Sequence, residues 1–100
     1  MLKKLGVNTE ALSPHITSRF GVVDHIFLKH AGREAIITSG NDSQHMIKSL
    51  HYKGRAIDLR TKDLTDKIKI KIVEDLRKTL GPDYDVILES THIHVEFDPK

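Results

Sequence analysis

Two stretches of the chain repeat apolar residues every three or four positions, which is the spacing of one helix face. The stronger stretch precedes the helix-ending pair Gly81 and Pro82, and its apolar positions are Ile68, Ile72, Val73, Leu76 and Leu80. The other follows Ser13 and Pro14, a capping hydroxyl before a proline, and its apolar positions are Ile16, Phe20, Val23 and Phe27. The pattern predicts two core-facing helices, the earlier one continuous to about Gly32.

Four shorter segments have the alternation or the β-branched residues of strands, at 35–38, 54–60, 85–88 and 92–97. The last is the most regular, because its odd positions are apolar while His92, His94 and Glu96 would share the other face of a strand. We expect an α+β fold in which a small, mainly antiparallel sheet is backed by the two amphipathic helices. Residues 41–50 are predicted to form an irregular loop or a short helical turn.

The composition is that of one globular domain over residues 1–100, with 38% hydrophobic and 30% charged residues. A formal net charge of +2, spread among acidic neighbours, argues against a nucleic-acid surface. We expect no signal peptide and no membrane-spanning helix; the localisation and the oligomeric state stay open. Because the chain has no cysteine, any metal must be bound by nitrogen and oxygen.

Seven histidines are unusual in a chain of this length, and the positions of some suggest a metal site. Asp58 shares a predicted strand face with Ala56, whose small side chain leaves space there. If this strand pairs with that of His94, the two side chains converge, and His51 approaches from the turn at Gly54. Three such ligands with an open fourth position are typical of catalytic zinc. The pattern therefore predicts a Zn²⁺ site made by His51, Asp58 and His94.

The same residues resemble the motifs of the LAS-type D-Ala-D-Ala metallopeptidases and of hedgehog domains. Residues 49–58 are similar to the S-x-H-x-x-G-x-A-x-D signature of those peptidases, and residues 92–94 are similar to their closing H-x-H. The resemblance covers about residues 36–97 and implies zinc ligation by His51, Asp58 and His94. A different register, with Glu89 and His92 as a base-and-ligand pair, would make His92 the third ligand.

The resemblance implies a zinc metallopeptidase that cleaves bacterial cell-wall peptide, as a D,D-carboxypeptidase or a phage-type endopeptidase. In that hypothesis zinc-bound water attacks the peptide carbonyl, Glu89 is the general base and then the acid, and His92 supports the oxyanion. The partner would be a peptidoglycan peptide. However, the related peptidases usually have an acid at the position that Thr91 occupies here. The alternative is a non-catalytic zinc-binding structural or binding module of the same fold.

Overall fold

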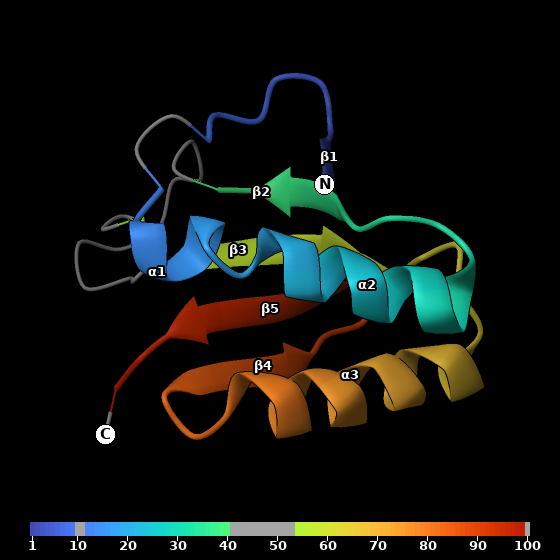
Figure 1. The fold of residues 1–100 in the computed structure, drawn as a ribbon. Helices are drawn as coiled ribbons and strands as arrows, with labels where there is room; N and C mark the ends of the chain where they lie inside the picture. Colours follow the sequence, from blue (N-terminus) through green and yellow to red (C-terminus); the bar gives the residue numbers. More distant parts are fainter. Residues whose placement is uncertain (10–11, 41–53, 100) are drawn as a thin grey trace.

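The computed structural model describes residues 1–9, 12–40 and 54–99. In chain order the elements are β1 (Leu2–Lys3), α1 (Pro14–Thr17), α2 (Phe20–Ala31), β2 (Ile36–Ser39), β3 (Ala56–Arg60), α3 (Asp66–Leu80), β4 (Tyr84–Leu88) and β5 (His92–Phe97). The strands form one sheet in the order β1-β2-β3-β5-β4. All neighbours are antiparallel except β1 and β2. Helices α2 and α3 lie side by side against the sheet (Figure 1), which confirms the predicted α+β architecture.

The hydrophobic core lies between this pair of helices and the sheet. Phe27 of α2 and Leu76 of α3 are both fully buried, as are Leu59 of β3 and Ile93 of β5. These residues belong to the apolar positions that the helical and strand periodicities predicted. The core therefore takes the apolar face of each central strand, and the polar side chains that alternate with it lie on the other face of the sheet.

The earlier helix is interrupted, which corrects the expectation of one continuous helix. Between α1 and α2 the Arg19 N–H donates to the carbonyl of Ile16 at 3.0 Å, three residues back rather than four. Ser18 and the glycine that follows Phe20 are poor helix formers, so the local preference for an uninterrupted helix is weak. The break lets α1 pack near the sheet, where the hydroxyl of Tyr84 donates to the His15 carbonyl at 2.7 Å.

Strand β5 has the predicted ends, whereas β2, β3 and β4 each differ from the prediction by one or two residues at one or both ends, and β1 was not predicted. Strand β1 consists of two residues that pair in parallel with β2, a length too short to show a periodic pattern. The prediction for residues 41–50 lies outside the described residues. In the described parts of the chain, no helix combines the length and apolar character needed to span a bilayer.

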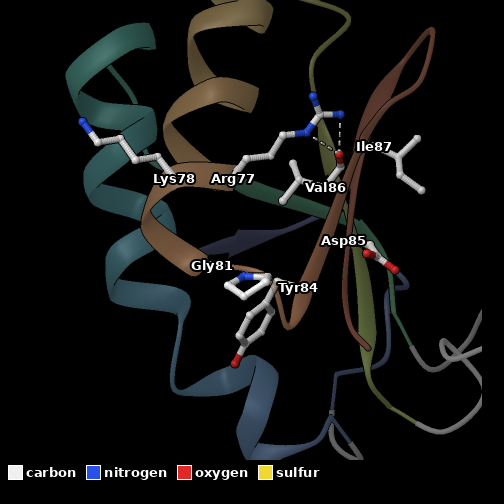
Figure 2. Close-up of a pocket in the computed structure, with 8 residues that line it drawn as sticks. Arg77, Lys78, Gly81, Tyr84, Asp85, Val86 and Ile87 are labelled. Atoms are coloured by element: carbon white, nitrogen blue, oxygen red, sulfur yellow. Dashed lines mark hydrogen bonds between the residues drawn. The ribbon is translucent and has the colours of Figure 1, made fainter. Parts of the chain in front are cut away.

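The outer edge of β4 is partly closed by Arg77 of α3. Its Nε and Nη2 donate to the Val86 carbonyl at 3.0 and 2.8 Å, beside a surface groove between α3 and β4 (Figure 2). Because β4 is the last strand of the sheet, its outward backbone groups have no neighbouring strand to bond. Arg77 therefore supplies donors to a carbonyl that the sheet leaves unpaired.

We expect Arg77→Met to lower the free energy of unfolding by about 1–3 kcal/mol, because the Val86 carbonyl loses both charged donors. Urea denaturation followed by circular dichroism measures this change. Lys78→Met removes the same charge from the next, exposed position of α3 and should have little effect. An equal loss in both variants would contradict the assigned role of Arg77.

Candidate metal centre

Strands β3 and β5 bring Asp58 and His94 directly opposite each other. The two strands are antiparallel neighbours, and their register pairs Asp58 with His94 and Arg60 with His92. Since side chains alternate along a strand, these four residues share one face of the sheet, while Ile93 enters the core from the other. The strand pairing on which the predicted site depends is therefore present, in the register that a shared site requires.

The side chains of this face converge on one carboxylate oxygen. Asp58 Oδ1 lies 2.9 Å from His94 Nδ1 and 3.7 Å from His92 Nε2. Only 9% of Asp58 is exposed to solvent, so its charge is largely removed from water and depends on these neighbours. The shorter distance favours His94 over His92 as the partner of Asp58.

Glu96 is a member of this group that was not assigned a site role from the sequence. Its Oε1 is in hydrogen-bond contact with His94 Nε2, so the imidazole is held at both nitrogens, by Asp58 on one side and Glu96 on the other. The alternation of residues 92–97 had already placed Glu96 on the polar face. The alternation does not show which neighbouring polar group the flexible Glu96 carboxylate contacts.

Glu96 also lies in a small acidic cluster with Asp85 of β4 and Asp98. One carboxylate oxygen from each of the three lies within 4.8 Å of the others. We assign no ion to this cluster, because exposed acidic groups commonly gather without one. Its consequence is electrostatic: the negative charge beside His94 is larger than Asp58 alone provides.

These contacts change the proton affinity of His94. Burial lowers the pKa of the imidazole, because the charged form loses its water. The hydrogen bonds and charges of Asp58 and Glu96 act in the opposite direction and prevail, so the pKa of His94 is raised above the ordinary value of 6.5. In the absence of metal, His94 therefore holds its proton more tightly in the folded chain than in the unfolded one.

We expect the metal-free protein to lose stability as the pH rises through the raised pKa of His94. This contribution is fully present below the unfolded-state pKa of about 6.5 and vanishes above the folded-state pKa, because the folded state binds the proton more tightly. Thermal unfolding in chelator-containing buffers across this range measures the change. His94→Gln should flatten the slope and His25→Gln, at an exposed helix position, should preserve it. An unchanged slope in His94→Gln would contradict the assignment.

The donor set fits a zinc ion. Ligand atoms at about 2.0–2.1 Å from a tetrahedral zinc are about 3.3 Å apart, and the 2.9 Å between Asp58 Oδ1 and His94 Nδ1 is close to that separation. Nitrogen with oxygen suits Zn²⁺ better than Ca²⁺ or Mg²⁺, which prefer oxygen alone. An imidazole that binds metal through Nδ1 carries its proton on Nε2, and Glu96 is placed to accept a hydrogen bond from that N–H.

Two further residues were predicted to belong to the site, His51 and Glu89. His51, the first predicted ligand, lies outside the described residues. Glu89, the predicted general base, is exposed in the turn between β4 and β5, and its backbone N–H donates to the His92 carbonyl at 2.9 Å. In the described chain no side-chain hydrogen bond or ion pair joins Glu89 to Asp58 or His94. The roles of His51, Asp58, Glu89, His92 and His94 remain predictions. Of the four that the structure describes, Asp58, His92 and His94 lie together.

Comparison with known protein sequences identifies the family of this chain. Residues 30–96 match the sequence model of the hedgehog amino-terminal signalling domain, a stretch that contains both Asp58 and His94. The chain belongs to this hedgehog domain family. A similar protein is the Tiggy-winkle hedgehog protein of Danio rerio, 38% identical over 60 residues, which are 58% of this chain and 14% of that protein. The hedgehog-family chain thus spans a small part of the length of this relative. No solved structure matches the chain.

Membership of the hedgehog domain family corrects the function expected from the motifs. The predicted cell-wall peptidase, its peptidoglycan substrate and its phage-like character are wrong, because the match is to a signalling domain of hedgehog proteins. The hedgehog part of the resemblance is confirmed, whereas membership of the LAS-type peptidases is not shown. Since the two groups have related folds, the shared motif indicated the fold and not the biological activity.

Proposed function

We propose that this hedgehog-family domain is a zinc-binding module that recognises another protein. The observation that carries the proposal is the family match over residues 30–96, which includes the converging pair Asp58 and His94. A signalling domain acts through the protein that it binds, so the ligand class that follows is a receptor-type protein surface. The zinc-bearing face of the sheet is the surface that we propose takes part.

In this proposal His51, Asp58 and His94 hold Zn²⁺, with His94 bound through Nδ1. The ion supplies a positive charge that neutralises the buried Asp58 and joins β3 to β5. The Nε2–H of His94 donates a hydrogen bond to Glu96, which so keeps the ring in one orientation. Because the unfolded chain has no preformed site, binding of the ion also favours the folded state.

The proposal includes no hydrolytic step. A general base must reach the water that it activates, directly or through one further water. Glu89 is exposed and has no side-chain link to Asp58 or His94 among the described residues, and Thr91 stands where the related peptidases have an acid. These features support the non-catalytic alternative that the sequence left open.

Selection from an mRNA-displayed peptide library, run on zinc-loaded and on chelator-treated protein, tests the proposal. We expect peptides that are enriched on the zinc-loaded domain and lost with His94→Gln. His25→Gln, which changes an exposed histidine of α2, is the matched control and should retain the enriched set. Equal enrichment with and without zinc would overturn the proposal, and so would cleavage of the bound peptides detected by mass spectrometry.

A further inference from the structure

A pocket lies on the polar face of the sheet, at the end of β3 that carries Arg60. Its volume is about 210 Å³, and its lining residues are Lys4, Thr38, Arg60, Lys62 and Thr91. They come from five separate places: the residue after β1, strand β2, the end of β3, the residues that follow β3, and the turn before β5. Pairing of the strands assembles them. The Lys4 N–H, for example, bonds to a carbonyl of β2 at 2.8 Å.

Among the residues that the structure describes, the lining holds three cations and no carboxylate. In the described chain, Lys4, Arg60 and Lys62 make no side-chain hydrogen bond and no ion pair, and Arg60 Nε is buried without an acceptor. Hydrogen bonds from Arg33 lower the pKa of Asp63, and the charge of Arg60 contributes to this shift. However, the two carboxylate oxygens of Asp63 accept hydrogen bonds from Arg33 Nε and Nη2 at 3.0 and 2.9 Å. The three like charges repel one another, and none of them forms an ion pair in the part of the chain that the structure describes, so an anion placed among them is favoured.

We propose that this pocket binds a doubly charged tetrahedral oxyanion, a sulfate or phosphate group. Three cations favour a double negative charge over the single charge of a carboxylate. The arginine guanidinium presents several donors in one plane, which suits oxyanions, while each lysine contributes a point charge. A volume of about 210 Å³, roughly that of seven liquid waters, accommodates such a group and the start of a molecule that carries it.

The two threonines of the pocket connect it to the metal centre. Thr91 Oγ1 lies 3.2 Å from His92 Nδ1, and Thr38 Oγ1 donates to the Asp58 carbonyl at 3.4 Å. Arg60 and His92 are partners in the β3–β5 register, two residues along from Asp58 and His94. The anion pocket and the candidate metal centre are thus neighbours on one face, although the pocket includes none of the predicted zinc ligands.

Calorimetric titration of the metal-free protein with sodium sulfate, with ionic strength held constant by sodium chloride, tests the proposal. We expect saturable binding at one site. Lys4→Gln and Lys62→Gln, which remove charges from two different elements, should each weaken it about tenfold. Lys67→Gln makes the same charge change at an exposed position of α3 and should alter the affinity by less than about twofold, as expected for screened charges.

A second arm with methyl phosphate distinguishes the sources of the anion. Displacement of sulfate by methyl phosphate supports a group carried as an ester on a larger molecule, and binding of inorganic sulfate and phosphate alone supports a free anion. Equal weakening by Lys67→Gln, or the absence of a saturable site, overturns the proposal. Because the titration uses no metal, its failure would leave the zinc-dependent function untouched.

Discussion

Asp58→Asn is expected to lower the zinc content of the purified domain from about one ion per chain to near zero. The substitution keeps the size of the side chain but removes the negative charge that lies 2.9 Å from His94 Nδ1. A neutral amide is a poor ligand for zinc, which prefers imidazole, thiolate and carboxylate. The stabilisation that bound zinc provides should disappear with it, because that stabilisation depends on the affinity of the folded state for the ion.

Elemental analysis gives the stoichiometry, and thermal unfolding with and without added zinc gives the stabilisation. Asp83→Asn makes the same change at an exposed position and should retain both the ion and the zinc-dependent shift in melting temperature. Glu96→Gln should retain the ion but bind it about tenfold more weakly, because Glu96 orients His94 without ligating the metal. Full zinc occupancy in Asp58→Asn would exclude this aspartate as a ligand.

Phe27→Ala is expected to destabilise the fold by about 3–5 kcal/mol. The ring is completely buried between α2 and the sheet, so the substitution removes apolar contacts and leaves a cavity. It also removes the ring over which the Arg33 guanidinium lies, 5.5 Å from the ring centroid. Since a domain of this size is stable by about 5–15 kcal/mol, the variant is expected to be close to unfolded at ordinary temperature.

Urea denaturation followed by circular dichroism measures the change through its midpoint. Leu28→Ala is the matched control, because Leu28 is the next residue of the same helix and is 54% exposed. It should shift the midpoint by a small fraction of the change produced by Phe27→Ala. Comparable shifts in the two variants would mean that α2 does not pack the face that carries Phe27 against the core.

The part of the candidate site predicted from the sequence is the part that depends on strand periodicity. Alternation placed His92, His94 and Glu96 on one face. On the opposite face Ile93 and Val95 are buried as expected, and Phe97 is partly buried. The contact between Glu96 and His94 was not predicted, because a strand pattern specifies a face and leaves the choice of partner to the surrounding side chains. The resemblance indicated the hedgehog family correctly and the activity wrongly, since related folds carry different functions.

The sequence by itself determined the α+β class, the buried stripes of the two main helices, and the shared face of His92, His94 and Glu96. Each of these follows from spacing along a single element, which is a local property. Only the tertiary structure decided that β1 joins the sheet, that Arg77 closes the edge of β4, and that Lys4, Arg60 and Lys62 line one pocket. These features depend on pairing between segments far apart in the chain, and such pairing is set by the packing of the whole core rather than by any local pattern.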